Sequence, residues 1–412
     1  MIKNHWKLTI LKDLCDPSDG VQIGPFGSQL HASDYVETGI PVVMPKNMVN
    51  NEISSASIAC ISEETANLLS KHRLITGDLV FARRGDVGNF SLVQPHQEGW
   101  LCGTGSIRVR LKPDIHPEFI SLLLQSHKVR HWLQSNAVGQ TMLNLNTEII
   151  SNLPLRVTDS FETQIALAND IQKWDRAIAL AEELIVAKRC LKQGLMQKLL
   201  TGQRRFSEFL HTDWISCSLG DLGKCHSGGT PDTKELLYWN GDIQWCTPTD
   251  ITALKTPFIS STSKSISELG LAKSSAEILP INSVIVCTRA TLGYCAVNTV
   301  PMATNQGFKS LIPNENVDTM FLYYLVLSLK REMQRRASGS TFMEISKKLF
   351  QKIPVRLPSQ IDEQKRIAGT LLSLDKHIDC LRQTLDLLKL QKRGVMQKLL
   401  TGEIRIPILD DA

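Results

Sequence analysis

The nine-residue stretch Gly-Leu-Met-Gln-Lys-Leu-Leu-Thr-Gly at residues 194–202 recurs as Gly-Val-Met-Gln-Lys-Leu-Leu-Thr-Gly at residues 394–402. Eight of the nine positions are identical, and the second copy begins 200 residues after the first. Self-similarity at a fixed offset is the sequence signature of a repeated structural unit. The stretch therefore predicts a fold built from two copies of one unit.

The agreement extends upstream of this stretch. Residues 153–157 align with residues 353–357 at the same offset, whereas residues 78–88 resemble residues 283–293 only loosely, at an offset of 205. We infer a tandem duplication whose front parts have diverged and whose back parts remain alike. The predicted segments are a front domain at 1–157, a helix at 158–206, a second front domain at 207–357 and a second helix at 358–412.

Each back part is predicted to form one long helix. Apolar residues alternate at spacings of three and four along both segments, a heptad seam typical of paired helices. Thr-Gly pairs at residues 201–202 and 401–402 supply helix stops. At 1.5 Å per residue, a helix of about 38 residues spans roughly 57 Å. The predicted seam contains Ile171, Trp174, Ile178, Ile185, Leu371, Leu374, Ile378, Leu381, Leu385 and Leu388.

Two exposed apolar stripes of this length need a partner, so we expect the two helices to pair with each other. The order domain–helix–domain–helix favours an antiparallel pair, with a front domain at each end related by a pseudo-twofold axis. Lys188 and Lys192 enter the first seam, so the pairing is expected to be imperfect there. The alternative is two separate core helices, because heptads also occur inside globular domains.

The front parts are predicted to be mixed α/β domains. Strand-like runs occupy residues 40–44, 78–82, 106–111 and 283–287, and glycine-rich turns separate them. One helix is expected to close each domain, near residues 118–134 in the first and 319–336 in the second.

Composition indicates an ordinary globular protein with a mild positive charge. The chain has 412 residues, 42% of them hydrophobic, and a formal net charge of +5. Its ten cysteines form no Cys-x-x-Cys pair, which favours reduced thiols in the cytoplasm. The N-terminal segment lacks the apolar stretch of a signal peptide, and no run is long enough to span a membrane.

Signatures of catalysis are sparse. The sequence has no phosphate-binding Gly-x-x-x-x-Gly-Lys-Ser/Thr loop and no Asn/Asp-Pro-Pro-aromatic motif for amine methylation. Residues 103–105, Gly-Thr-Gly, lack the third glycine of a dinucleotide site and favour a turn. Residues 231–234, Pro-Asp-Thr-Lys, only superficially resemble a nuclease, because one aspartate would have to serve both halves of that motif.

A histidine pair has the spacing of metal ligands. His127 and His131 lie four residues apart on one predicted helix face, but no third ligand is evident. Lys128, Arg130 and Trp132 flank them. We therefore favour a solvated or phosphate-facing basic surface over a metal site.

The better functional signal is a set of polar residues that recurs just beyond corresponding predicted strands. Arginine forks bind guanine or phosphate bidentately, and amides read adenine edges. The structural alternatives are a surface salt bridge for each arginine and helix capping for the amides. The candidate DNA-binding residues are Lys46, Asn47, Arg83, Arg84, Gln140, Asn144, Asn146, Thr249, Arg289, Thr291, Asn305, Gln306, Ser340 and Thr341.

With these features in view, the chain resembles the specificity subunits of type I restriction–modification systems over essentially its whole length. The duplicated segment that closes each long helix is the most specific element of the resemblance. Residues 24–30, Gly-Pro-Phe-Gly-Ser-Gln-Leu, resemble one opening of a target-recognition domain. Residues 227–231, Ser-Gly-Gly-Thr-Pro, followed by residues 238–243, resemble another.

The resemblance implies two α/β target-recognition domains separated by antiparallel helices, and double-stranded DNA as a partner. It further implies assembly with two modification subunits, which hold S-adenosylmethionine, and two restriction subunits, which use ATP and Mg²⁺. No cofactor is expected in this chain, and no active site. Each domain would read one half-site while the helices fix the unread spacer. The alternative is a stand-alone DNA-binding protein of the same architecture.

Overall fold

The computed structural model describes residues 6–26, 29–139, 143–339 and 343–401, and the side chains of residues 400 and 401 are left out of account. The chain forms two compact units. The first comprises Met1–Ile178 and Leu387–Ala412, and the second comprises Ala179–Asp386. Each unit therefore contains one front domain and a segment of both long helices, a division that follows contacts rather than chain order.

The first unit contains two four-stranded sheets, with strand orders β10-β4-β7-β3 and β2-β11-β8-β9, and an antiparallel pair of β1 with β12. Every residue of β8 and β11 is buried, as expected for apolar runs in the centre of a sheet. The strands are β1 Trp6–Ile10, β2 Val21–Ile23, β3 Tyr35–Val36, β4 Ile40–Val43, β5 Met48–Val49, β6 Glu52–Ile53, β7 Ala59–Ile61, β8 Leu79–Ala82, β9 Phe90–Leu92, β10 Leu101–Cys102, β11 Ser106–Val109 and β12 Pro154–Thr158.

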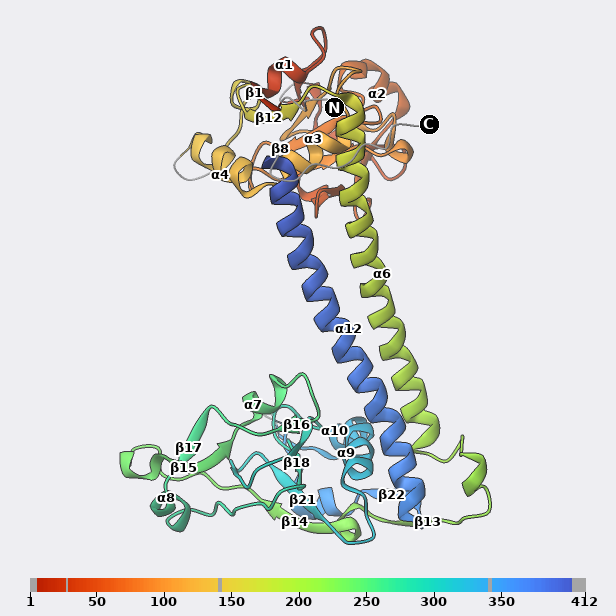
Figure 1. Cartoon of the computed structure of the whole chain (residues 1–412), viewed down its shortest axis with the longest axis vertical. Helices are drawn as coiled ribbons and strands as arrows, with labels where there is room; N and C mark the ends of the chain where they lie inside the picture. The colour runs from red at the N-terminus through yellow and green to blue at the C-terminus, as the bar shows by residue number, and fades with distance from the viewer. Residues whose placement is uncertain (1–5, 27–28, 140–142, 340–342, 402–412) are drawn as a thin grey trace. The chain divides into compact units, whose positions relative to one another are not determined.

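The single helix predicted near residues 118–134 is two helices, so that expectation was wrong. The Ser126 hydroxyl accepts a hydrogen bond from the Val129 N–H and starts a new helix after α3 ends. The second unit breaks in the same place, between α9 Thr319–Ser328 and α10 Lys330–Arg336. The helices of the first unit are α1 Leu11–Leu14, α2 Glu63–Leu68, α3 Pro117–Leu124, α4 His127–Asn136 and α5 Thr147–Ser151, and the first part of α6 Phe161–Leu199 (Figure 1).

The second unit repeats this plan with different sheets. Their orders are β14-β21-β18-β19-β16, β17-β15-β20 and β13-β22. The strands are β13 Trp214–Ser218, β14 Gly223–Ser227, β15 Trp239–Cys246, β16 Phe258–Ile259, β17 Lys264–Ile266, β18 Val284–Val286, β19 Cys295–Asn298, β20 Ala303–Thr304, β21 Lys309–Pro313 and β22 Pro354–Pro358. The helices are α7 Pro248–Thr252, α8 Glu268–Ala272, α9 Thr319–Ser328, α10 Lys330–Arg336, α11 Lys347–Gln351 and α12 Ile361–Thr401.

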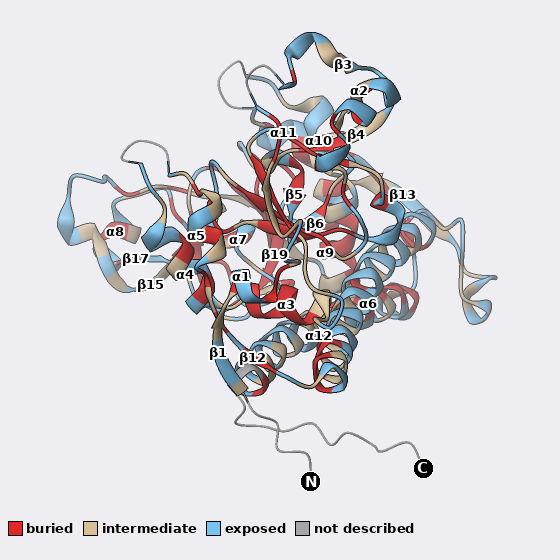
Figure 2. Cartoon of the chain, turned by 90° about the horizontal axis from the view of Figure 1, so that it is seen from above, coloured by how far each residue is buried: buried red, intermediate tan, exposed pale blue. Residues whose placement is uncertain are grey.

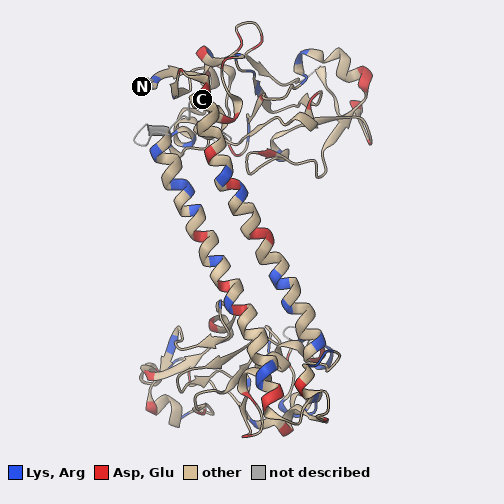
Figure 3. Ribbon diagram, turned by 45° about the vertical axis from the view of Figure 1, so that its right-hand side comes forward, with Lys and Arg blue, Asp and Glu red and all other residues tan. Residues whose placement is uncertain are grey.

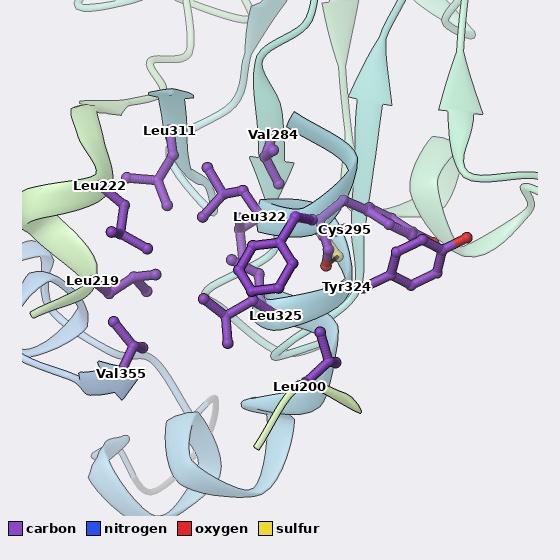
Figure 4. Packing of buried hydrophobic residues seen from close by; sticks show 14 of the residues in the cluster. Leu200, Leu219, Leu222, Val284, Cys295, Leu311, Leu322, Tyr324, Leu325 and Val355 are labelled. Atoms are coloured by element: carbon purple, nitrogen blue, oxygen red, sulfur yellow. Dashed lines mark hydrogen bonds between the residues drawn. The ribbon is translucent and has the colours of Figure 1, made fainter. Parts of the chain in front are cut away.

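The core of the second unit forms around α9, which has six buried residues in succession. Leu322 and Leu325 pack with Leu219, Leu222 and Leu311 in one apolar cluster (Figure 4). Leu199 of α6 and Leu371 of α12 belong to the same cluster. The long helices are therefore part of the core of the unit, and not only connectors.

Within each unit, α6 and α12 run antiparallel, which confirms the predicted pairing. In the first unit, Leu399 of α12 joins Leu167 and Ile171 of α6 in one core cluster. In the second unit, Lys192 contacts Asp375, while Arg205, beyond the end of α6, contacts Glu363. The order along one helix is the reverse of the order along the other.

The seam residues form the inner side of these helix segments. Ile171, Ile185, Leu371, Leu374 and Ile378 are buried, and the other members of the predicted seam are half-buried. The residues between them are mostly exposed, and they are coloured pale blue on the helix ribbons in Figure 2. Residues of both charge signs occur along the two long helices (Figure 3). This is the burial pattern of a solvated helix pair with one apolar stripe on each helix.

Lysines that interrupt the seam form ion pairs that the duplication repeats. In the first unit, Lys392 Nζ lies 2.5 Å from Asp175 Oδ1, and in the second, Lys192 Nζ lies 2.6 Å from Asp375 Oδ1. Tyr324 adds a 2.7 Å hydrogen bond from its hydroxyl to Asp375 Oδ2. Burial and this bond raise the pKa of Tyr324. Each of these lysines is thus paired with an aspartate on the other long helix.

Among the described residues, no helix is long and apolar enough to cross a membrane.

Candidate nucleic-acid interface

In the first unit, three chain segments meet at the loop that follows β8. The Arg83 N–H donates to the Gly105 carbonyl at 2.8 Å, and the Arg83 carbonyl accepts from the Leu145 N–H at 2.9 Å. Arg84 forms a β-bridge with Asn144, which also bridges Val138. Candidate residues that are 61 positions apart in sequence are therefore adjacent in the fold.

The two arginines of this loop have different surroundings. Arg83 is half-buried, and its Nε donates to Asn144 Oδ1 at 3.0 Å, whereas Arg84 is exposed. Burial, and then the positive charge of Arg84, lower the pKa of Arg83. An amide oxygen, rather than a carboxylate, holds the Arg83 guanidinium, so this contact does not neutralise its charge.

The turn that carries Lys46 lies against the same loop. A Cβ placed on Gly105 would lie 3.4 Å from Pro45 Cγ. Lys46 is exposed, but Asn47 is only 2% exposed, and its Oδ1 accepts from the Met44 N–H at 3.0 Å. Asn47 is therefore reassigned from DNA contact to stabilising the turn.

The two candidate asparagines after α4 have different roles. Asn146 Oδ1 accepts from the Ile149 N–H at 2.7 Å, which makes Asn146 the N-cap of α5. Of the two alternatives for this residue, the structure supports capping. Asn144 binds Arg83, as described above. Gln140 lies outside the described residues.

The second unit builds an equivalent loop after β18. The Thr288 N–H donates to the Gly307 carbonyl at 2.8 Å, and the Thr288 carbonyl accepts from the Ile345 N–H at 3.0 Å. Arg289 forms a β-bridge with Glu344, as Arg84 does with Asn144. A Cβ on Gly307 would lie 3.9 Å from Pro248 Cγ, so the turn that carries Thr249 is also near. The backbone plan of the two loops is the same.

The side chains on this second loop differ from those on the first. Arg289 Nε lies 3.8 Å from Glu344 Oε2, and Lys309 Nζ lies 3.9 Å from Glu344 Oε1. Lys309 is 8% exposed, and burial lowers its pKa. One carboxylate thus lies between two cations in the second loop, at the position where the first loop has the uncharged Asn144.

The remaining candidates of the second unit are spread around this loop. Thr249 is exposed at the start of α7. Asn305 Oδ1 accepts from the Gly307 N–H at 2.9 Å, and exposed Gln306 accepts from the Thr230 hydroxyl. Thr291 is half-buried, and its hydroxyl is shielded from solvent. Ser340 and Thr341 lie outside the described residues.

Gly24 and Gly228, from the two segments that resemble the start of a target-recognition domain, bind backbone close to these loops. The Gly24 N–H donates to the Ser106 carbonyl, and the Gly228 N–H donates to the Phe308 carbonyl. A Cβ at Gly24 would collide with the Gly103 carbonyl, and one at Gly228 with the Asn305 carbonyl. Glycine is required at both places because another backbone segment passes so close.

In each unit, a basic helix precedes the residue that forms the β-bridge with the loop, Asn144 or Glu344. In α4, the rings of His127 and His131 stack with centroids 6.3 Å apart, and Lys128 and Arg130 are exposed. In α10, Arg331 and Arg335 are exposed, and Arg335 pairs with Glu332 at 2.6 Å. Positive charge beside polar loops is the arrangement expected of a surface that binds a polyanion.

Glu344 and Lys309 lie at the second loop but are not among the candidate residues predicted from the sequence. Glu344 occupies the position of Asn144 at the offset of 200, so the repeat itself was the available signal. Lys309 lies in an apolar strand, and its Nζ contacts the backbone carbonyls of Gln306 and Phe308. Nothing local in the sequence shows that contact.

Comparison with known proteins identifies the family. A family model described as "Type I restriction modification DNA specificity domain" matches residues 5–187 and 211–390. The chain belongs to this family. It carries two copies of the DNA specificity domain, and each match covers one front domain with a large part of the helix that follows it.

Relatives named as specificity subunits of type I restriction enzymes match part of the chain or nearly all of it. The MjaIX specificity subunit of Methanocaldococcus jannaschii is 34% identical over 40% of this chain and 39% of its own length. The EcoR124I/EcoR124II specificity subunit of Escherichia coli is 30% identical over 54% of this chain and 55% of its own length. The putative MjaX specificity subunit of M. jannaschii is 22% identical over 98% of this chain and 95% of its own length.

Two solved specificity subunits share the fold. The S subunit from M. genitalium matches with a TM-score of 0.56 at 17% identity, covering 100% of this chain and 98% of that chain. The HsdS subunit from Thermoanaerobacter tengcongensis matches with a TM-score of 0.55 at 19% identity, covering 97% of each chain. These likenesses support the architecture of a duplicated specificity subunit.

Backbone strain gives a testable difference between the two loops. Gly85 has φ +83°, and the corresponding Ala290 keeps φ +58°, a left-handed conformation that costs a residue with a Cβ about 1 kcal/mol. We expect Ala290→Gly to be neutral or to raise the free energy of unfolding by up to about 0.5 kcal/mol, because the gain is partly offset by chain entropy. We expect Gly85→Ala to lower it by about 1 kcal/mol.

The Gly85→Ala change isolates the backbone effect because a Cβ there would meet no atom within 4 Å. Urea unfolding of the full chain measures both variants. A clear loss of stability in Ala290→Gly, or none in Gly85→Ala, would show that the loop conformation is not strained.

Proposed function

We propose that the chain is the DNA-recognition subunit of a type I restriction–modification complex and has no active site of its own. Each unit binds one half of a split site in double-stranded DNA, with the loop after β8 or β18 facing the bases. The chain assembles with two modification subunits and two restriction subunits. S-adenosylmethionine, ATP and Mg²⁺ bind to those partners and not to this chain.

The observation that carries the proposal is the pair of equivalent loops with different side chains. The backbone contacts of Arg83 with Gly105 and Leu145 are repeated by Thr288 with Gly307 and Ile345. Arg289 repeats Arg84, but Thr288 stands in place of Arg83 and Glu344 in place of Asn144. A common frame with different polar groups is what two half-sites of different sequence require.

The long helices are proposed to set the distance between the half-sites. They are continuous over 39 and 41 residues, and their seams and ion pairs fix one antiparallel register in each unit. DNA advances about 3.4 Å per base pair, so a rigid spacer selects particular separations and helical phases.

A domain exchange tests the assignment. We expect that replacing residues 1–157 with the front domain of another specificity subunit changes one half of the methylated motif, while replacing residues 207–357 changes only the other. The readout is the methylome of a host that expresses the chain with its modification subunit. Unaltered motifs after both exchanges would contradict recognition by the front domains.

Co-purification tests the partners and the absence of catalysis. The tagged full chain should retain a methyltransferase subunit, and the purified chain incubated with DNA, Mg²⁺ and S-adenosylmethionine should show neither methylation nor cleavage. Binding to a split site without any retained methyltransferase would support a stand-alone DNA-binding protein instead. Turnover by the purified chain would make it an enzyme.

A further inference from the structure

In the first unit, Arg83 and Arg84 have different roles. The Arg83 side chain is held inside the loop by Asn144, so its Nε is already used. The Arg84 side chain is exposed, while its backbone is fixed by the β-bridge to Asn144. Arg84 therefore combines a constrained backbone with an available guanidinium.

The backbone around Arg84 is anchored on both sides. Arg83 is hydrogen-bonded through its N–H and its carbonyl to two different segments, and the Val87 N–H donates to the Gly85 carbonyl at 3.0 Å. Gly85 adds no side chain, and the space around its Cβ position is open. A site that reads a base needs this combination, because the reading group must be placed accurately and the base edge must be able to approach.

No carboxylate neutralises Arg84. In the described ranges, neither Arg83 nor Arg84 has an ion-pair partner, and exposed Lys46 lies on the neighbouring turn. Arg84 and Lys46 thus present exposed hydrogen-bond donors, while the exposed carboxylate of Asp86, two residues after Arg84, forms no ion pair with Arg84 among the described residues. Guanine presents two acceptors, O6 and N7, in the major groove, and arginine binds both with its two N–H groups.

The second unit lacks this arrangement. Arg289 occupies the equivalent backbone position, but its Nε lies 3.8 Å from the Glu344 carboxylate, where Arg84 has Asn144 as its bridge partner. Its loop therefore offers a donor and an acceptor together. The two units are not expected to prefer the same base at this position.

We propose that Arg84 determines sequence specificity by reading a guanine in the half-site of the first unit. This inference rests on the proposed function, and it adds the base and the residue that reads it. Arg83 keeps the loop in place through Asn144. The requirement for guanine belongs to one position of one half-site.

The experiment compares the full-length wild-type chain with Arg84→Ala and Arg84→Lys. Each is used to select from duplexes with both half-sites randomised, and the bound pools are sequenced at several salt concentrations. The matched control is Arg189→Ala, an exposed arginine on α6 that is remote in sequence from both loops. Arg289→Ala serves as the corresponding change in the second unit.

The expected result is the loss of a guanine preference of about 5- to 150-fold at one position of one half-site in Arg84→Ala. Arg84→Lys should restore affinity but not the full preference, because lysine lacks the planar fork. Arg289→Ala should alter only the other half-site, and Arg189→Ala should alter neither.

Two outcomes would overturn the inference, and a third concerns the proposed function. Uniform weakening over all sequences, with a salt slope reduced by about one, would make Arg84 a phosphate contact. An unchanged motif would remove Arg84 from the interface. If the wild-type chain itself selected no split motif, the proposed function would fail, whatever the variants did.

Discussion

Removing seven residues from the middle of both long helices is expected to abolish recognition of the native split site. The deletion takes residues 179–185 from α6 and residues 382–388 from α12, two segments matched by the register of the Asp–Lys pairs. Seven residues keep the heptad phase of the seam and shorten each helix by roughly 10.5 Å, about three base pairs of DNA.

A protein that engages only one half-site loses the gain from simultaneous binding, which is typically 10²- to 10⁴-fold. We therefore expect binding to the native site to fall by at least about 100-fold. Sites with a spacer changed by about three base pairs should be the new preference, provided that the helical phase allows both contacts. Fluorescence anisotropy with a series of spacer lengths measures both effects.

The matched control deletes the same seven residues from α6 alone. It breaks the register of the seam and should destabilise the chain without producing a new preferred spacer. If the double deletion bound the native spacing as well as the wild type, the helices would not set the distance between half-sites.

The second large effect is expected from Asp375→Ala. Lys192 and Asp375 are 16% and 20% exposed, and Asp375 also accepts from the Tyr324 hydroxyl. Removing the carboxylate leaves a largely buried ammonium group without its counter-charge, which costs about 2–4 kcal/mol. The melting temperature of the chain should fall by several degrees, as measured by calorimetry.

The duplication supplies the control for this change. Asp175→Ala breaks the equivalent pair with Lys392. The Lys392 side chain is 17% exposed, much like Lys192, but Asp175 is 52% exposed, so water screens this pair and its loss should cost less, about 1 kcal/mol. The exchange Lys192→Asp with Asp375→Lys should recover part of the stability, because the pair is re-formed with reversed charges. Equal effects of Asp375→Ala and Asp175→Ala would show that burial of the pair does not matter.

Much of the architecture was predictable because it depends on patterns that are local in the chain. The heptad spacing from Ile171 to Ile185 and from Leu371 to Leu388 predicted two long helices and their pairing. The four strand-like runs coincide with β4, β8, β11 and β18. The repeat also predicted corresponding loops after corresponding strands.

The candidate site was predictable only in part. Arg83, Arg84 and Asn144 do meet, but Asn47 is buried in its turn and Asn146 caps a helix. Asparagine suits a base edge, a turn and a helix cap equally well. Sequence alone cannot choose among these roles, because the choice depends on which backbone groups surround the amide after folding.

By itself, the sequence determined the duplication, the two helices with their apolar seams and the α/β character of the front domains. These features follow from the periodicity of neighbouring residues and from repetition at one offset. Only the tertiary structure decided that Lys192 has Asp375 as its partner, and that Glu344 faces Arg289 where Asn144 holds Arg83. Such contacts join residues far apart in the chain, and their free energy depends on burial and distance, which exist only once the chain has folded.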